Sequence, residues 1–310
     1  MNYVTLTRQI ISEMTKEKNL RLYGFDWDDN ILRMPTKINM EVKKNGKWVP
    51  VKVSTEDFAH LRTDPNYRTL PNSFEDFTRP EKFLEDTEMA IENNRKSPSF
   101  RKFKENLIHA NPFSIITARG HNPQVIKKGV RLFIEMVLSP EEQETMVDNI
   151  IDMFKHEEVF SKNFLQKLDR LNDNQIIDLY LDERGDYYPV SSKEFGQKFG
   201  LETSGGASNP EHAKKVALLD FISKYNDLIS SGKYVNTSLG FSDDDSRNVS
   251  AMVEYVKNEL SRMYPEVKFI IYDTSEGGYN KIHIEANKED NNEVMLENLI
   301  KRTILKIKSK

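Results

Sequence analysis

One short run of the chain, LRLYGFDWDDNIL at residues 20–32, constrains the fold more than any other. It alternates, is rich in aromatic residues and ends in acids, which indicates a β-strand that carries carboxylates to the edge of a sheet. Because the chain must turn after Asp26, both Asp26 and Asp28 can face one crevice, although side chains alternate along a strand. Two carboxylates held close together repel each other, and a bound divalent cation relieves that repulsion. A solvated acidic turn that caps the next segment is the alternative interpretation.

The amino-acid composition is that of a globular protein without thiol chemistry. Of 310 residues, 30% are charged and 37% are hydrophobic, which is enough for a large core. The absence of cysteine excludes disulfide bonds, thiolate metal ligands and a cysteine nucleophile. Residues 1–18 lack the apolar segment of a signal peptide, and no apolar run elsewhere is long enough to span a bilayer. We therefore expect a cytoplasmic protein without a membrane partner.

The charge pattern argues against a general nucleic-acid-binding protein. The net charge is −4, and both signs are interspersed along most of the chain. The segment 301–310 is basic, but cations at the C-terminus of a helix explain it more simply than a nucleic-acid partner does. Nucleic acid is therefore the less favoured partner.

Hydrophobic periodicity and turn signals predict strands that alternate with helices. Asn45 and Gly46 separate two alternating runs and predict a β-hairpin over 38–53, because a type I′ turn needs positive φ at both central residues. The other strands are predicted at 20–25, 112–117, 175–181 and 234–241, and at 267–272 paired with 281–285. Helices are predicted within 1–18 and at 55–61, 80–93, 98–109, 124–155 with a break near Ser139, 212–222, 249–264 and 292–306.

Strands separated by helices predict an α/β fold with a mostly parallel sheet, right-handed connections and a site at the carboxyl ends of the strands. We assign residues 1–33 and 111–310 to the core. That core carries a helical insertion at about 124–170 and a loop insertion at about 183–209. Residues 34–110, the hairpin and three helices, form an insertion between two sheet strands.

Polar side chains suited to chemistry recur at the ends of these elements. Thr117 ends a buried strand, and a small-residue turn leads from it to a helix, an arrangement in which backbone N–H groups bind anions. A helix N-cap is the alternative for Thr117. Lys214 and Lys215 lie on a predicted helix, where at least one of them belongs to a solvated face, and three aspartates at 243–245 follow another strand. The six histidines show no metal-ligand spacing, so we assign none to a site.

Four short motifs follow one another in a fixed order: FDWDDN at 25–30, IITARG at 115–120, KKVAL at 214–218 and SDDDSRNV at 242–249. In order and spacing they resemble the haloacid dehalogenase-like (HAD) superfamily, whose members are mostly magnesium-dependent phosphatases. The resemblance covers the core strands, about half of the chain, and is weak in the two long insertions.

Individual positions both match and depart from the family pattern. Asp29 and Asn30 stand where glycine and threonine are commonest, whereas the second motif matches closely. The lysine followed three residues later by Ala-Leu favours Lys214 over Lys215 as the third motif. In the fourth motif, Asn248 falls where several members have asparagine, and which of the three aspartates bind metal stays open.

The resemblance implies a magnesium-dependent phosphomonoesterase. Asp26 would attack phosphorus and form an aspartyl-phosphate, and Asp28 would act as general acid and base. Thr117 would hydrogen-bond a phosphoryl oxygen, and Lys214 would balance the negative charge on the nucleophile and phosphate. The implied Mg²⁺ ligands are Asp26, the backbone carbonyl of Asp28, Asp243 or Asp244, and water.

The insertion at 34–110 lies where HAD-like proteins carry a cap over the site. Prolines near Met34 and Asn111 would fix its hinges, so we expect a small phosphorylated substrate held partly by aromatic or basic residues of the insertion. Two alternatives remain: a HAD-derived interaction or assembly protein with weak or lost catalysis, and a phosphatase acting on nucleic-acid ends.

Overall fold

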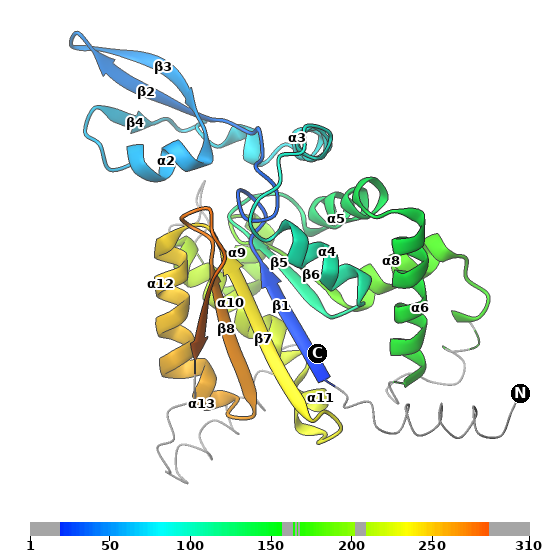
Figure 1. The fold of residues 1–310 in the computed structure, drawn as a ribbon. Helices are drawn as coiled ribbons and strands as arrows, with labels where there is room; N and C mark the ends of the chain where they lie inside the picture. Colours follow the sequence, from blue (N-terminus) through cyan, green and yellow to red (C-terminus); the bar gives the residue numbers. More distant parts are fainter. Residues whose placement is uncertain (1–18, 157–163, 165, 167, 202–208, 285–310) are drawn as a thin grey trace, which may run out of the picture.

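The computed structural model describes residues 19–156, 164, 166, 168–201 and 209–284. Within these ranges the chain forms a mixed α/β body and a smaller β-sheet beside it (Figure 1). The helices predicted within 1–18 and at 292–306 lie outside the described residues. No helix in the described ranges combines the length and the apolar character needed to cross a membrane.

The body is built on a six-stranded sheet, here called the main sheet, whose order in the described chain is β6-β5-β1-β7-β8-β9. All neighbouring pairs are parallel except β8 and β9, which are antiparallel. The prediction of an α/β fold with a mostly parallel sheet is therefore confirmed. The strands are β1 (Asn19–Phe25), β5 (Phe113–Thr117), β6 (Gly185–Pro189), β7 (Asn236–Asp243), β8 (Val267–Asp273) and β9 (Asn280–Ile284).

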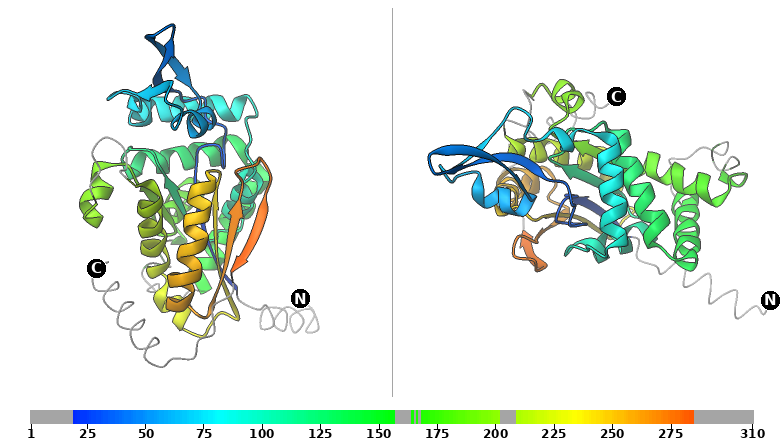
Figure 2. Two further views of the ribbon diagram at one scale, coloured as in Figure 1. Left: turned by 90° about the vertical axis from the view of Figure 1, so that its left-hand side faces the viewer. Right: turned by 90° about the horizontal axis from the view of Figure 1, so that it is seen from above.

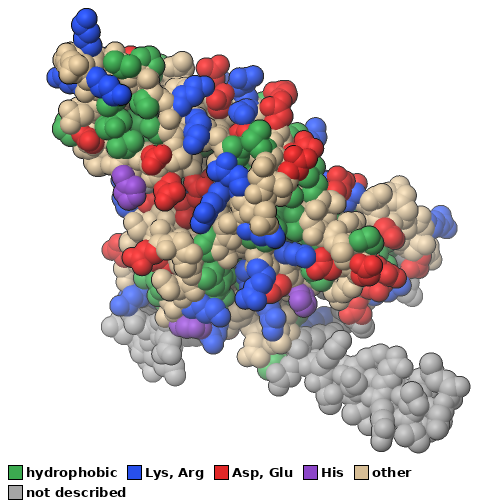
Figure 3. All heavy atoms as spheres, turned by 45° about the horizontal axis from the view of Figure 1, so that its top comes forward, with side chains coloured by type: hydrophobic (Ala, Val, Ile, Leu, Met, Phe, Trp, Pro, Cys, Tyr) green, Lys and Arg blue, Asp and Glu red, His purple; other side chains and the backbone are tan. Residues whose placement is uncertain are grey.

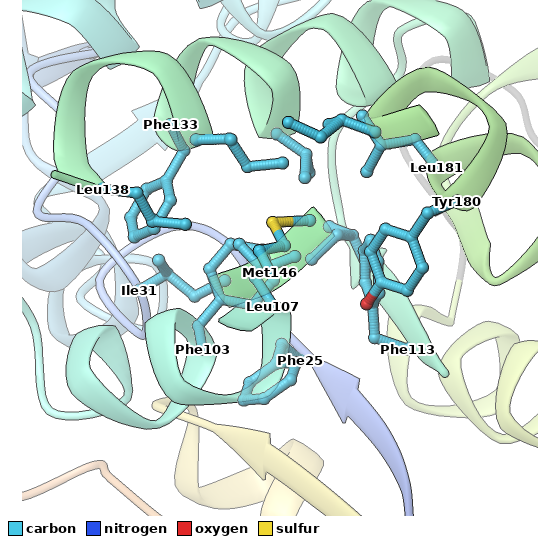
Figure 4. Packing of buried hydrophobic residues seen from close by; sticks show 14 of the residues in the cluster. Phe25, Ile31, Phe103, Leu107, Phe113, Phe133, Leu138, Met146, Tyr180 and Leu181 are labelled. Atoms are coloured by element: carbon cyan, nitrogen blue, oxygen red, sulfur yellow. The ribbon is translucent and has the colours of Figure 1, made fainter. Parts of the chain in front are cut away.

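Helices cover both faces of the main sheet, because alternate residues of its strands enter different hydrophobic clusters. Tyr23 and Phe25 of β1 pack in one cluster, whereas Leu20 and Leu22 pack in the other. The first cluster, drawn in Figure 4, takes its helical residues from α3 (Pro80–Glu92), α4 (Phe100–Ile108), α5 (Pro123–Val137), α6 (Pro140–His156) and α8 (Asp173–Glu183). The second takes them from α9 (Lys193–Phe199), α10 (Pro210–Ser223), α11 (Asn226–Ser230), α12 (Ser246–Tyr255), the π-helical turn η2 (Val256–Leu260) and α13 (Ser261–Met263).

A second, three-stranded sheet stands above the carboxyl ends of the main sheet (Figures 1 and 2). This small sheet has the antiparallel order β3-β2-β4 and contains the predicted hairpin. Asn45 and Gly46 have φ of 51° and 77°, as the predicted turn requires. Its elements are β2 (Ile38–Lys44), β3 (Lys47–Val53), α2 (Thr55–Leu61), β4 (Tyr67–Thr69) and the 3₁₀ turn η1 (Glu75–Phe77).

The segment 34–110 divides between these two parts of the molecule. The small sheet has a hydrophobic cluster of its own, which includes Ile38, Met40 and Val53. The helices α3 and α4 instead bury Phe83 and Phe103 in the first cluster of the body. The part from β2 to η1 therefore has its own small core, while α3 and α4 pack onto the body.

The prediction of a strand at 175–181 is wrong, because this stretch lies inside α8. Asn172 and Gln175 form a capping box, which satisfies backbone N–H groups that a helix start leaves free. The apolar run is also compatible with a helix, since its buried residues recur on one helical face: Ile176, Ile177, Tyr180 and Leu181.

The segment 183–209, predicted as loop, contains both β6 and α9. β6 has the sequence Gly-Asp-Tyr-Tyr-Pro and lacks an alternating apolar pattern. It forms the edge of the main sheet through parallel pairing with β5, and an edge strand tolerates the proline at its end. Pairing with a strand about 70 residues earlier in the chain, which no local pattern encodes, fixes it as a strand.

Candidate active site

The strands that carry the predicted motifs are neighbours, with β1 between β5 and β7. Their parallel register brings Asp26, Thr117 and Asp243 to one edge of the main sheet. The carboxyl ends of parallel strands are where such sheets bind ligands. All three side chains are buried, and Asp243 has no exposed surface.

Three carboxylates and one ammonium form the centre of the site. Asp26, Asp243 and Asp244 each place one oxygen within 4.8 Å of the others. Lys214 extends from α10 between them: its Nζ lies 2.6 Å from Asp243 Oδ2 and 3.3 Å from Asp26 Oδ1. The four groups leave a formal charge of −2, which one divalent cation neutralises. Their oxygen donors also suit Mg²⁺, so these residues fit the metal that the sequence predicts.

The pKa values of this group reflect its burial. The pKa of Asp26 is raised from 3.8 to about 8, chiefly by removal from water; the charge of Lys214 opposes this shift, and the nearby Asp243 and Asp28 add to it. Burial, with the charges of Asp26, Asp243 and Asp29, also raises the pKa of Asp244. For Lys214, burial favours the neutral amine, but the carboxylates of Asp243 and Asp26 outweigh it and raise its pKa above the ordinary value. The metal-free cluster therefore retains protons that a bound cation would displace.

Asp28 lies next to this cluster but is paired with a different cation. Its Oδ1 accepts from Arg119 Nη2 at 2.7 Å, and its Oδ2 accepts from Arg119 Nε at 2.8 Å. Asp28 is therefore paired with Arg119 and does not belong to the group of carboxylates around Lys214. Thr117 Oγ1 lies 3.5 Å from Asp28 Oδ2 and faces the same space.

The structure separates residues that the motifs left ambiguous. Lys215 places its ammonium 5.8 Å from the ring centre of Tyr255, away from the carboxylates that Lys214 contacts. Asp245 is the N-cap of α12, where its carboxylate accepts from the backbone N–H of Arg247. Asp243 and Asp244, and not Asp245, are therefore the aspartates placed beside Asp26.

Other motif positions have structural roles. Asn248 donates to Asp243 Oδ1 at 3.0 Å and so orients a candidate metal ligand. Thr117 is not a helix N-cap, because α5 begins at Pro123 and is capped by Asn122. The interpretation of Thr117 as a cap is thus excluded, and its hydroxyl instead accepts from the backbone N–H of Arg119 at 3.4 Å.

Sequence reasoning missed Asn30, which holds the first motif in shape. Its side-chain amide donates to the backbone oxygen of Asp26 and to Ser242 Oγ, both at 2.9 Å. Its carbonyl oxygen accepts from Ser99 and Thr274 at 2.8 and 3.0 Å. Asn30 has no exposed surface and joins the loops after β1 and β8 to the end of β7 and the start of α4. The only sequence signal was an asparagine where the family pattern favours threonine.

The space between the main-sheet site and the small sheet is a cavity of about 1170 Å³. The small-sheet unit contributes aromatic and basic residues to its lining, among them Phe58, Phe74, His60 and Arg62. In Figure 3, acidic and basic side chains lie side by side along the junction between the small sheet, at the upper left, and the body. An ion pair of 3.1 Å between Arg62 and Asp245 crosses this junction.

Comparisons of the chain with protein-family models, with curated proteins and with solved structures found no significant match. The resemblance to HAD-like proteins therefore rests on the four motifs alone.

Proposed function

We propose that the protein is a Mg²⁺-dependent phosphomonoesterase in which Asp26 is the nucleophile. The observation that carries the proposal is the group of Asp26, Asp243, Asp244 and Lys214, mostly buried, whose formal charge of −2 suits one divalent cation. A second carboxylate, Asp28, stands two residues from the nucleophile and outside that group. One carboxylate for attack and another for proton transfer are what a phosphoryl transfer through an enzyme-bound intermediate needs.

Each residue has a defined task in this reaction. Mg²⁺ held by Asp26, Asp243, Asp244 and the backbone carbonyl of Asp28 would supply the positive charge that lets an anionic nucleophile approach a phosphate. Asp26 attacks phosphorus and displaces the leaving oxygen, which takes its proton from Asp28. Water then hydrolyses the aspartyl-phosphate and returns a proton to Asp28.

Two further side chains stabilise charge without forming bonds to phosphorus. Lys214 remains protonated and offsets the negative charge that collects on Asp26 and the phosphate. Thr117 donates its hydroxyl proton to a phosphoryl oxygen. Each oxygen of Asp28 accepts one hydrogen bond from Arg119 and keeps a second lone-pair site, so the carboxyl group can carry the transferred proton while it stays paired with Arg119.

The cavity supports a small phosphorylated substrate. Its volume of about 1170 Å³ has room for an organic leaving group beside the phosphate. Aromatic Phe58 and Phe74 offer apolar contacts to that group, and Arg62 and His60 offer polar ones. We propose no individual substrate.

The test is turnover of p-nitrophenyl phosphate with Mg²⁺ and with EDTA. We expect Asp26→Asn to lower kcat by several orders of magnitude while the fold is retained, because the nucleophile is lost. Lys214→Ala should also lower kcat strongly. The matched variant Lys215→Ala should leave it unchanged, because Lys215 lies outside the site. A beryllofluoride adduct should form on Asp26, and an adduct on any other residue would contradict the assignment.

A folded, Mg²⁺-binding protein that hydrolyses neither p-nitrophenyl phosphate nor a panel of phosphorylated metabolites, nucleotides and 3′-phosphorylated oligonucleotides would favour the alternative of an interaction protein. Turnover confined to the oligonucleotides would favour the alternative of a nucleic-acid end phosphatase.

A further inference from the structure

Arg119 is the buried charged residue nearest the candidate site to which the proposed function gives no task. It follows the second motif strand, and its side chain has no exposed surface. A buried guanidinium is costly unless its charge is paired and its donors are used. The reason for its position must therefore lie in the groups that it contacts.

Those contacts hold the guanidinium in one orientation. Its carbon lies 4.8 Å from the ring centres of both Phe77 and Phe83, so one aromatic ring belongs to η1 and the other to α3. Nη2 donates to Thr36 Oγ1 at 2.8 Å, and Nη1 lies 3.3 Å from His121 Nε2. Burial, together with the charge of Arg119, lowers the pKa of His121 to about 4, so the neutral ring can accept this hydrogen bond near pH 7.

Thr36, which accepts a hydrogen bond from Arg119, is itself held in place. Thr36 donates to Asp86 Oδ2 at 2.6 Å, and Asp86 accepts from Lys82 at 2.7 Å. Thr36 and Asp86 are both buried. This chain ties Arg119 to α3 and to the connection that leads into β2. The planar guanidinium of Arg119 thus presents Nε and Nη2 to Asp28 in a fixed direction. A lysine ammonium cannot make this two-point contact.

We infer that Arg119 is a positioning residue: it sets the orientation of the Asp28 carboxylate for proton transfer and acts on turnover through Asp28 alone. Its Nε and Nη2 are both engaged by the Asp28 carboxylate, so the contact of Arg119 with the proposed machinery is Asp28. The inference rests on the proposed function, since it assigns Asp28 the transfer of protons to and from the leaving oxygen and water.

A double-mutant cycle tests this dependence. We would measure kcat and KM for p-nitrophenyl phosphate and for an alkyl phosphate with the wild type, Arg119→Lys, Asp28→Asn and the double variant. Arg119→Lys should lower kcat for the alkyl phosphate by about 10- to 100-fold, somewhat less than typical loss of general acid–base catalysis, and leave KM unchanged. The loss should shrink for p-nitrophenyl phosphate, whose leaving group needs less protonation. In the Asp28→Asn background, Arg119→Lys should have no further effect on kcat.

Two further variants separate positioning from general damage to the fold. Arg184→Lys alters another buried arginine, which lies 5.9 Å from the ring of Phe154 on the side of the body away from the site, and should change neither kcat nor its dependence on the leaving group. If Arg119→Lys does not fold, Thr36→Val replaces it in the same cycle. Removing one hydrogen bond to Arg119 should cause a smaller loss that also vanishes in the Asp28→Asn background.

The outcomes distinguish this inference from the proposed function. Two results would overturn the role of Arg119 but leave the proposed phosphatase activity intact, provided that the wild type turns over. In the first, the losses of kcat from Arg119→Lys and Asp28→Asn add in the double variant. In the second, Arg119→Lys raises KM and leaves kcat unchanged. Equal losses for the aryl and alkyl phosphates would also overturn it. Absence of wild-type turnover would overturn the proposed function, and this inference with it.

Discussion

At the scale of single residues, Asp29 occupies a backbone conformation that disfavours an L-amino acid. Its φ is 53°, in the left-handed region where glycine is the usual residue. The carboxylate accepts a hydrogen bond from the hydroxyl of Thr55, the first residue of α2. Burial raises the pKa of Asp29 from 3.8 to about 6. Asp29 is thus strained in its backbone and partly removed from water at the point where the first motif contacts the small-sheet unit.

We predict that Asp29→Gly leaves the global free energy of unfolding nearly unchanged but loosens α2. Relief of the strain contributes about 1 kcal/mol, and loss of the hydrogen bond to Thr55 costs about as much. The lost hydrogen bond held the start of α2, and relief of strain at Asp29 does not restore that contact. Backbone amides of α2 should therefore exchange hydrogen faster. Urea unfolding and hydrogen exchange measure the two quantities. Asp29→Asn is the matched control, since asparagine tolerates this φ and keeps an acceptor, and unchanged exchange in Asp29→Gly would contradict the predicted contact.

Residues that stand at strand ends are easier to predict from sequence than residues that support them. Asp26 and Thr117 are polar and follow buried apolar runs, so a local pattern is enough to single them out. In the sequence, Arg119 was only one residue of the turn after the second motif strand, with no pattern that indicated a role. Its role depends on Asp28 and Phe83, which lie 91 and 36 positions away along the chain and meet it only in the folded state.

At the scale of secondary-structure elements, the strand predicted at 175–181 is helix α8 and the predicted loop contains strand β6, for different physical reasons. A short apolar run suits a buried strand and a helix face equally well, so its periodicity does not decide between them. The capping box of Asn172 and Gln175 was the local signal that favoured a helix. β6 had no comparable signal, because its pairing with β5 is non-local.

The packing of α3 on α5 depends on a glycine within a helix. A Cβ atom at Gly129 would lie 2.5 Å from Cε1 of Phe83, and Phe83 is itself held between Trp27 and His121. Alanine would raise the intrinsic helix propensity by about 1 kcal/mol. Overpacking of a buried ring typically costs about 1–3 kcal/mol, however, and the ring has no free direction in which to move.

We therefore predict that Gly129→Ala lowers the free energy of unfolding by up to about 2 kcal/mol, as measured by urea denaturation. Gly278→Ala is the control, because a Cβ atom there meets nothing within 4 Å. It should change stability by less than about 0.5 kcal/mol. A Gly129→Ala protein as stable as the wild type would show that Phe83 can move without cost.

At the scale of the whole molecule, strand order explains why distant motifs meet. The sequence predicts helices between strands and hence a mostly parallel sheet, but no local pattern predicts that β1 lies between β5 and β7. That order brings the first, second and fourth motifs together at one edge. The position of the small sheet above that edge is likewise a tertiary feature, and it produces the cavity beside the carboxylates.

The acidic cluster also links the stability of the whole fold to pH and Mg²⁺. In the metal-free protein the pKa of Asp26 is raised to about 8, whereas in the unfolded chain it returns to its ordinary value of 3.8. Between these values the folded state binds the additional proton, so metal-free stability falls as pH rises, by up to about 1.4 kcal/mol per pH unit for one proton. The raised pKa of Asp244 acts in the same direction. His121, with a pKa lowered from 6.5 to about 4, acts in the opposite direction, but only below pH 6.5.

We accordingly predict that, in EDTA, the melting temperature falls between pH 6.5 and 8 and that excess Mg²⁺ reverses this trend. Metal binding displaces the retained protons, so the stabilisation by a fixed Mg²⁺ concentration grows as pH rises. Thermal unfolding in EDTA and in Mg²⁺, at several pH values across this window, measures both slopes. Asp26→Asn is the matched control: an amide does not titrate, so the slope in EDTA should become shallower and the response to Mg²⁺ weaker. A wild-type melting temperature that is constant or rises with pH in EDTA would show that the cluster is ionised without metal, because solvation or Lys214 then suffices to stabilise its charge.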